Sequence, residues 1–224
     1  MNSPAIERRA WKDDEVSESK RKQLEAARLA EALLPAVSRI SAALRKYAMA
    51  ASSSLGSDCY VHAELGRVLL NDLGFATRLV AGFAAWRIGP GADDVLGHVP
   101  HLTAYAPTGG PGLAYHTWLE CSALLIDFTT YQLQHKARQL DAADGGTTTV
   151  TWCPPFLCAQ RHELRRYEEL VHARTAGLAY YQARPELDSV LQPHSQVHPA
   201  HVSAMRLLLA NPDMNVIGPN DLGT

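Results

Sequence analysis

One cysteine stands where a helix is expected to begin. The stretch GSDCYVHAELGRVLLNDLG, residues 56–74, has helical periodicity, with Ser57 or Asp58 as the N-cap and Gly74 as the stop. Cys59 then occupies the first helical position, where unpaired N–H groups and the helix dipole favour a thiolate. The thiolate is the nucleophilic form of cysteine, so this placement is typical of a reactive thiol.

A histidine and an aspartate lie on two segments that are expected to pair as a hairpin. HTWLEC begins at His116 and ALLIDFTT contains Asp127, and both alternate as strands do. A two-residue loop of Cys121-Ser122, or a four-residue loop from Glu120 to Ala123, brings His116 directly opposite Asp127, whereas a loop of three or five residues would separate the pair. The four-residue loop is favoured, because Cys121-Ser122 suits a primed two-residue turn poorly.

A thiol, an imidazole and a carboxylate are the three groups that nucleophilic thiol catalysis needs. The imidazole of His116 would carry a proton to the leaving group, and the carboxylate of Asp127 would fix the imidazole tautomer. The backbone N–H of Cys59, unpaired at the helix start, could donate a hydrogen bond to an oxyanion. Taken singly, each residue also has a structural interpretation, as a small buried thiol, a core histidine or a turn-capping carboxylate.

At these residues the sequence resembles the transglutaminase-like superfamily of papain-type thiol enzymes. The family pattern is a cysteine at a helix start, then G-x-x-aR-x-v-x-G, then HaWvE, then vDpT. The matching stretches here are DCYVHAELGRVLLNDLGFATRLVAG, HTWLE and IDFTT, in the family's chain order. The resemblance implies Cys59 as nucleophile, His116 as general base and acid, and Asp127 as orienting residue. Phe128 stands where the family has proline.

The resemblance also implies a fold and a range of activities. The fold would be papain-like, with the cysteine-bearing helix packed on an antiparallel sheet. The superfamily includes proteases, acyl transferases, deamidases and members without activity, so the expected function is a thiol-dependent hydrolase or acyl transferase acting on an amide-type bond through an acyl-enzyme. The alternative is a catalytically silent domain that binds a peptide or partner protein. A peptide or protein substrate is expected, with Trp118 and Tyr60 as candidate pocket residues.

A second histidine is a rival base. His62 lies three residues after Cys59 on the predicted helix, and helical side chains lean towards the N-terminus, so it could reach the thiol. No carboxylate in the pattern orients it, which favours His116.

Two clusters have metal-ligand residue types. A zinc site at the first would need a fourth ligand, and its cysteine spacing is wide; the second is more typical of a polar linker. We therefore expect no metal and no cofactor. The clusters are Cys153, Cys158 and His162, and His194, His198 and His201.

The order of predicted elements is helices, then strands, then helices, which indicates an α+β fold rather than alternating βαβ units. We expect a mobile N-terminus over 1–17 and a single domain over 18–224, with a catalytic core at about 52–155 and helical extensions on both sides. Helices are predicted over 19–34, over a second segment that begins after a break at Pro35, and over 56–74, 131–143, 160–184 and 199–210. Residues 75–88 are predicted as one or two strands with Gly82 as a bulge, and further strands are predicted over 101–106, 115–121, 123–130 and 147–153.

Composition indicates an ordinary globular protein. Of 224 residues, 46% are hydrophobic and 20% charged, and the net charge is -2, so neither nucleic acid nor a membrane is expected as a partner. The charged first residues do not resemble a signal peptide, so we expect a cytoplasmic protein whose four cysteines are free thiols. The charged first helix is a candidate oligomer contact.

Overall fold

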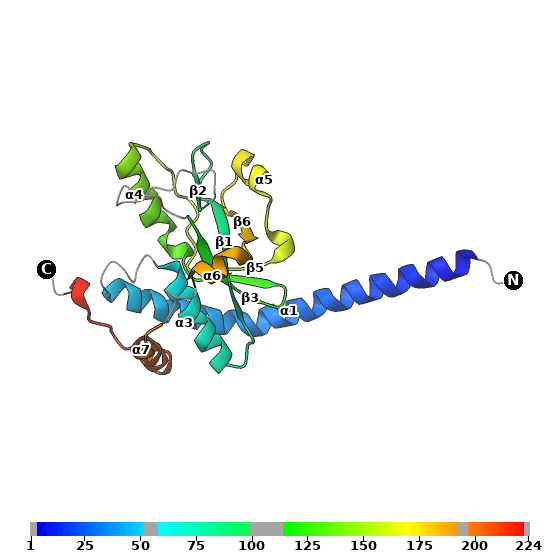
Figure 1. The fold of residues 1–224 in the computed structure, drawn as a ribbon, viewed down its shortest axis with the longest axis horizontal. Helices are drawn as coiled ribbons and strands as arrows, with labels where there is room; N and C mark the ends of the chain where they lie inside the picture. The colour runs from blue at the N-terminus through cyan, green and yellow to red at the C-terminus, as the bar shows by residue number, and fades with distance from the viewer. Residues whose placement is uncertain (1–3, 52–57, 99–113, 192–196, 222–224) are drawn as a thin grey trace.

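The computed structural model describes residues 4–51, 58–98, 114–191 and 197–221 (Figure 1). Six strands form one antiparallel sheet in the order β2-β1-β3-β4-β5, and β6 also pairs with β1. The α+β class predicted from the sequence is confirmed. The strands are β1 (Arg78–Arg87), β2 (Val95–His98), β3 (His116–Cys121), β4 (Leu124–Asp127), β5 (Leu157–Gln160) and β6 (Leu178–Ala183).

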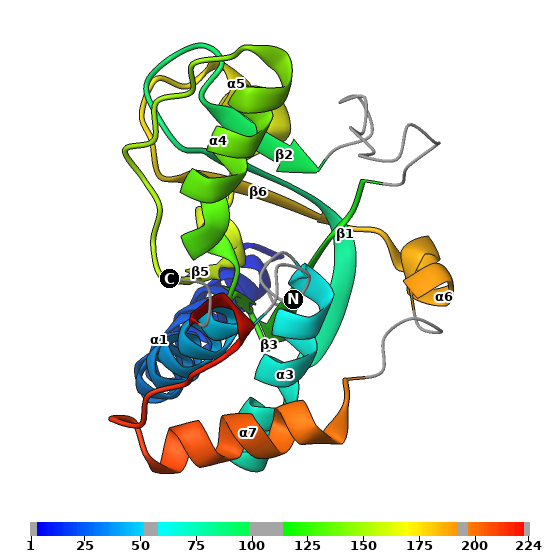
Figure 2. The same ribbon diagram turned by 90° about the vertical axis from the view of Figure 1, so that its left-hand side faces the viewer.

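Helices cover both faces of this sheet. The α-helices are α1 (Pro4–Ala50), α3 (Cys59–Asp72), α4 (Leu133–Asp144), α5 (Tyr167–His172), α6 (Asp188–Leu191) and α7 (Pro199–Ala210). Short 3-10 turns are η1 (Thr130–Gln132), η2 (Arg161–Glu163), η3 (Pro185–Leu187) and η5 (Pro219–Asp221). In Figures 1 and 2, α1, α3 and α7 gather at one end of the molecule and α4, α5 and β2 at the other, with the curved β1 between them.

The main core lies between α1, α3, α7 and one face of the β3-β4 hairpin. Leu119 of β3 and Ile126 of β4 point into it and meet Leu65 of α3 and Ile40 of α1, all fully buried. Trp118 and Leu125, which directly precede them in the two strands, face the opposite side of the sheet and form a separate cluster. Every residue of β3 and β4 is buried, because both faces of the hairpin are covered.

The first helix differs from its prediction. α1 is continuous over 47 residues and passes through Pro35, where a break was expected. A proline removes one helical hydrogen bond, but Leu33, Val37 and Ile40 flank it on one face and are fully buried in the main core. Packing of that face therefore outweighs the local cost. The N-terminal half of α1 projects from the rest of the molecule (Figure 1). Within the described residues, no helix is both long enough and apolar enough to span a membrane.

One long helix was predicted over 160–184, and this was wrong. The chain from Leu157 to Ala183 contains two strands instead. It forms β5, α5 and β6, and Gly177 takes a positive φ of 93° directly before β6. β6 pairs with β1 from Gly82 to Arg87, so a long-range partner overrides the local helical propensity. The predicted strand over 147–153 is also wrong: the N–H groups of Thr151 and Trp152 both donate to one carbonyl, that of Ile88, and no ladder follows.

Two further strand predictions have different outcomes. The predicted strand over 101–106 lies outside the described residues. The strand predicted over 75–88 exists as β1, but Gly82 is not a bulge. It pairs in regular register with both His116 and Ala183, and a Cβ atom there would lie 2.0 Å from the carbonyl oxygen of Gln182. Glycine is required by close approach of the strands.

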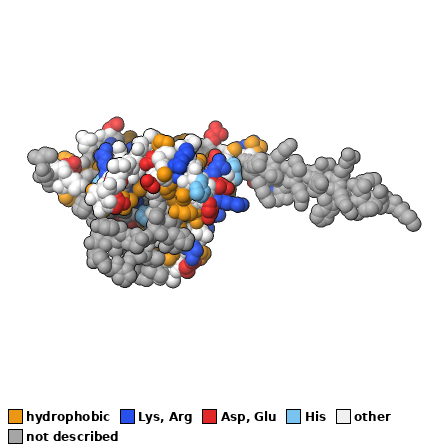
Figure 3. All heavy atoms as spheres, turned by 90° about the horizontal axis from the view of Figure 1, so that it is seen from above, with side chains coloured by type: hydrophobic (Ala, Val, Ile, Leu, Met, Phe, Trp, Pro, Cys, Tyr) orange, Lys and Arg blue, Asp and Glu red, His pale blue; other side chains and the backbone are white. Residues whose placement is uncertain are grey.

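Charged side chains of both signs are mixed on one face of the molecule (Figure 3). Figure 3 shows positive and negative side chains interspersed on the face it presents, as expected from 21 basic and 23 acidic residues.

We predict that Gly66→Ala destabilises the protein. Gly66 lies within α3, and a Cβ atom there would stand 2.3 Å from Cε2 of the buried Phe128 ring. Alanine favours an isolated helix by about 1 kcal/mol, but overpacking a core costs about 1–3 kcal/mol, and a ring enclosed on all sides cannot move away. Urea unfolding should therefore give a lower free energy of unfolding.

The double variant Gly66→Ala/Phe128→Leu should lose less free energy of unfolding than the sum of the two single changes, because leucine vacates the space of the ring. Unchanged or greater stability of Gly66→Ala would show that α3 does not press on Phe128.

Candidate active site

The start of α3 is built as predicted. Asp58 is the N-cap, in extended conformation, and its Oδ1 accepts hydrogen bonds from the N–H groups of Tyr60 at 2.9 Å and Val61 at 3.2 Å. The N–H of Cys59, the first helical residue, is not used by this cap, and no acceptor for it is found among the described residues. The Cys59 residue itself is 9% exposed. Its thiol lies at the positive end of the α3 dipole.

The hairpin that carries His116 and Asp127 is not in the predicted register. Its loop consists of Ser122 and Ala123, with Ser122 at a φ of 55°, so both loops considered from the sequence were wrong. The strands are shifted by two residues relative to the prediction. A two-residue shift leaves every side chain on its own face, whereas a shift of one would have moved Asp127 to the opposite face.

His116 and Asp127 are therefore diagonal rather than directly opposite neighbours. Leu119 pairs with Ile126, so continuing the register places Trp118 opposite Asp127. Diagonal side chains on one face are still within reach of each other when one of them is long. Nε2 of His116 lies 2.9 Å from Oδ2 of Asp127, and the residues are 0% and 1% exposed.

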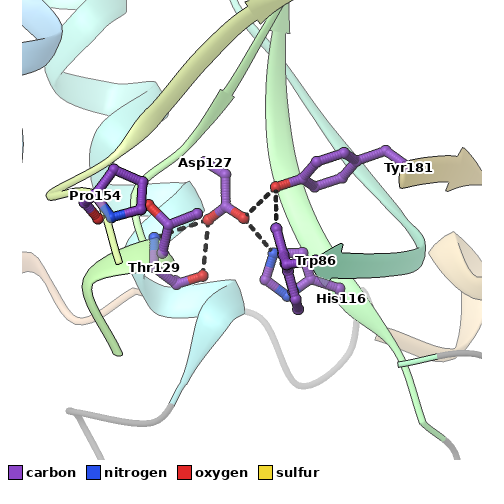
Figure 4. A network of polar contacts seen from close by, with 7 residues as sticks. Trp86, His116, Asp127, Thr129, Pro154 and Tyr181 are labelled. Carbon is purple, nitrogen blue, oxygen red and sulfur yellow. Dashed lines mark hydrogen bonds and ion pairs between the residues drawn. The ribbon is translucent and has the colours of Figure 1, made fainter. Parts of the chain in front are cut away.

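The Asp127 carboxylate accepts four hydrogen bonds (Figure 4). Oδ2 accepts from His116 and from the hydroxyl of Tyr181 at 2.7 Å, and Oδ1 accepts from the backbone N–H and the hydroxyl of Thr129, both at 2.7 Å. The Tyr181 oxygen in turn accepts a hydrogen bond from the indole N–H of Trp86 at 2.8 Å. An ionised carboxylate only accepts, so the proton shared with Asp127 sits on Nε2 of His116 and leaves Nδ1 for the thiol.

The charges in the site shift one another's pKa values. Burial alone would lower the pKa of His116, but the charge and hydrogen bond of Asp127 raise it to about 9. Burial would raise the pKa of Asp127, but the charge of His116 and the hydrogen bonds hold it well below its usual range. Burial would likewise raise the pKa of the Cys59 thiol, yet hydrogen bonding to His116 and its charge make the net shift downward. Together these shifts favour a thiolate–imidazolium pair at neutral pH.

Aromatic rings enclose the His116 imidazole. Trp86 meets it edge-on, with ring centroids 4.9 Å apart, and His98 lies parallel to it at 5.8 Å. Burial, followed by the charges of Lys136 and His116, lowers the pKa of His98 to about 3, so His98 stays neutral beside the imidazolium. Burial and the charge of Asp127 raise the pKa of Tyr181 well above its usual value, which keeps its phenol a donor.

The rival base His62 is engaged elsewhere. Its Nδ1 lies 2.8 Å from the carbonyl oxygen of Asp58 and its Nε2 lies 2.9 Å from the hydroxyl of Tyr131. Both ring nitrogens are thus occupied, and burial lowers the pKa of His62. His62 secures the first turn of α3 instead of approaching the thiol.

The two predicted pocket residues, Trp118 and Tyr60, belong to different clusters of packed side chains. Trp118 is 1% exposed and packs with Val80 and Leu125, which makes it part of the core. Tyr60 is half-buried and packs beside Ala81.

The other cysteines do not share the environment of Cys59, and the described members of the two groups with metal-ligand residue types form no metal site. Burial raises the pKa of Cys121, and raises that of Cys158 to about 11, in contrast to Cys59. Within the described part of the chain, no three His, Cys, Asp or Glu side chains are arranged to hold a metal ion, and this includes Cys153, Cys158 and His162. The histidine cluster falls partly outside the described residues, because they do not include His194.

Sequence reasoning missed most of the residues around the three predicted groups. Tyr181 was placed within a helix, although the tyrosine pair of LAYYQA, a segment directly after Gly177, was a signal for a strand. No sequence signal connected Trp86, His98 or Lys136 to the site, because their separation along the chain closes only when β1, β2 and α4 pack together.

Comparison with known proteins identifies no family. No protein-family model matches this chain, and no curated protein matches it. A solved crystal structure of a genomics target, APC5867, is similar with 18% sequence identity and a TM-score of 0.48, over 79% of this chain and 78% of that one. A likeness of this degree assigns neither a family nor an activity.

We predict that Tyr181→Phe destabilises the protein by about 2 kcal/mol, because hydrogen bonds to charged groups contribute about 1.5–3 kcal/mol. The change removes one donor from the buried Asp127 carboxylate and the acceptor of the Trp86 indole. The neighbouring Tyr180→Phe is the matched control. Its hydroxyl donates to the exposed Gln182, so the free energy of unfolding should change by less than about 0.5 kcal/mol. Equal losses in the two variants would contradict a special role for the Tyr181 hydrogen bond.

We predict a pH-dependent stability that Asp127→Asn abolishes. The pKa of Asp127 is lowered in the folded protein, so its contribution to stability is lost as the pH falls below the pKa of an aspartate in the unfolded chain, about 3.9. The His116 pKa is raised, so its contribution is full below about 6.5 and is lost as pH rises towards about 9. At pH 6 the free energy of unfolding of Asp127→Asn should be about 3 kcal/mol lower than that of the wild type. This difference should become smaller by pH 9. A constant gap over this range would contradict the pairing.

Proposed function

We propose that this protein is a thiol-dependent hydrolase or acyl transferase of transglutaminase-like type, acting on an amide-type bond in a peptide or protein. The observation that carries the proposal is the buried His116, which Asp127 holds by Nε2 while Nδ1 remains without a hydrogen bond of ordinary geometry. This imidazole lowers the pKa of the Cys59 thiol at the start of α3. A thiol at a helix start, beside an imidazole that a carboxylate orients, is the arrangement of a papain-type nucleophile.

In the proposed reaction the Cys59 thiolate attacks the carbonyl carbon of the amide. The backbone N–H of Cys59 stabilises the negative charge that forms on the carbonyl oxygen. His116 gives its Nδ1 proton to the leaving nitrogen as the C–N bond breaks, and a thioester remains on Cys59. A water molecule or an amine then attacks the thioester, His116 takes its proton, and cleavage of the C–S bond restores the thiolate.

The surroundings of the site support this chemistry. α3 packs against β3 of an antiparallel sheet, as the resemblance to the superfamily implies. Asp127 is saturated by four donors and remains ionised, so it stabilises the imidazolium without removing its proton.

A silent binding domain is the second candidate. The burial of the thiol favours it, because Cys59 is 9% exposed and His116 is not exposed at all. In that case the three residues would act only as a buried polar network, and the thiol would have ordinary reactivity.

The decisive measurement is the pH dependence of Cys59 alkylation by iodoacetamide, read at each cysteine by peptide mass spectrometry. We predict rapid labelling of Cys59 near pH 6, where a free thiol with a pKa of about 8.5 is almost entirely protonated. His116→Ala should abolish this labelling, because the thiolate loses its counter-charge. His62→Ala is the matched control and should retain it, because His62 contacts Asp58 and Tyr131 instead.

Cys121 and Cys158 serve as internal standards, since burial raises the pKa of both. If the labelling of Cys59 follows the pH dependence of an ordinary thiol and does not change in His116→Ala, the enzyme proposal is contradicted and the silent binding domain is favoured.

A further inference from the structure

The residue after His116 has a buried hydroxyl with no ordinary hydrogen bond. Thr117 is the second residue of β3, pairs with Ala81 of β1 and is 1% exposed. Its Oγ1 makes no hydrogen bond of ordinary geometry in the described structure, in the same way as Nδ1 of His116. Burial of a hydroxyl without a partner lowers stability, and most such groups in folded proteins are paired.

Thr117 lies on the side of β3 that faces α3. It shares that face with Leu119, which packs in the main core, and its partner Ala81 packs beside Tyr60, the residue after Cys59. Burial raises the pKa of the Cys59 thiol, and hydrogen bonding from His116 and, more weakly, from Thr117 lowers it. Hydrogen bonds in catalytic sites are often long before substrate binds and tighten during the reaction.

Charged and titratable groups approach Cys59 from each element around it. His116 comes from β3, and Lys136 comes from α4 and also lowers the thiol pKa. Asp58 caps the same helix, and Tyr115 precedes β3, with its pKa raised to about 12 by burial and then by the charge of Cys59. Thr117 differs from the charged groups among these, because its hydroxyl is neutral and keeps its proton over the whole working pH range.

We propose that the Thr117 hydroxyl is a second hydrogen-bond donor to the Cys59 thiolate, acting beside His116. This inference rests on the proposed function, since it assigns a further residue to the same reactive thiol. One strand then supplies both donors from consecutive positions, and because such side chains leave β3 on opposite faces, the two donors reach the sulfur from different sides. The hydroxyl transfers no proton: it stabilises the anion and fixes the sulfur relative to the imidazole.

The competing explanation is packing. A threonine on the sheet side of α3 could be present only for its methyl group, with a hydroxyl that does nothing. Thr117→Val retains the shape and removes the hydroxyl, whereas Thr117→Ser retains the hydroxyl and removes the methyl group. The two variants therefore separate the explanations.

The test is the iodoacetamide profile of Cys59 in these variants together with their thermal midpoints. For Thr117→Val we expect the acid limb to move up by about one pH unit, which corresponds to about tenfold slower labelling near pH 6. The thermal midpoint should stay the same or rise, because an unpaired buried hydroxyl has been removed. Thr117→Ser should retain the wild-type profile.

Thr130→Val is the matched control. Thr130 is equally buried, but its hydroxyl donates to the carbonyl oxygen of Pro154 at 3.0 Å. Its loss should lower the thermal midpoint and leave the Cys59 profile unchanged, which is the opposite signature to that of Thr117→Val.

An unshifted profile in Thr117→Val, with an activated thiol in the wild type, would overturn the role of Thr117 and leave the proposed function intact. An ordinary thiol profile in the wild type itself would overturn both. If Thr117→Val fails to fold, Thr117→Ala gives the same comparison, because it too lacks the hydroxyl.

Discussion

The buried carboxylate of Asp127 is the group on which the rest of the site depends. An unpaired charge in a protein interior is strongly destabilising, so this carboxylate must be surrounded by donors. The donors come from β3, from β6 and from the turn after β4, in the form of His116, Tyr181 and Thr129. Satisfying one charge therefore holds together strands that are far apart in the chain, and it leaves one imidazole nitrogen free.

The thiol is brought to that nitrogen by packing rather than by polar contacts. α3 lies on β3 with Leu65 in the main core, and Gly66 allows Phe128 to approach the helix closely. Phe128 is the residue directly after Asp127, so the contact that sets the position of the helix also sets the position of the carboxylate. Any change that pushes α3 away from Phe128 would move Cys59 relative to His116.

The electrostatics of the site follow from opposing effects. Burial disfavours each charged form, which would raise the pKa of Cys59 and lower that of His116. The hydrogen bond and charge of His116 reverse the shift of Cys59, and Asp127, followed by Cys59, reverses the shift of His116. His98 shows what happens without a hydrogen-bonded carboxylate, because burial and the neighbouring positive charges leave it neutral. The polar residues around the sulfur are thus divided between those that carry charge and those, such as Thr117, that only donate.

The sequence alone was sufficient for the α+β class, the start of α3 at Asp58 and Cys59, and a contact between His116 and Asp127, because these depend on local capping and on a two-residue strand period. The two-residue period of a strand also explains why the contact forms although the predicted register was wrong: a shift of two residues keeps each side chain on the same face of the sheet. Only the tertiary structure decided that α1 continues through Pro35 and that Tyr181 lies on a strand beside Asp127. Burial of a helix face and pairing with β1 outweigh local propensity there, and neither partner is near in sequence.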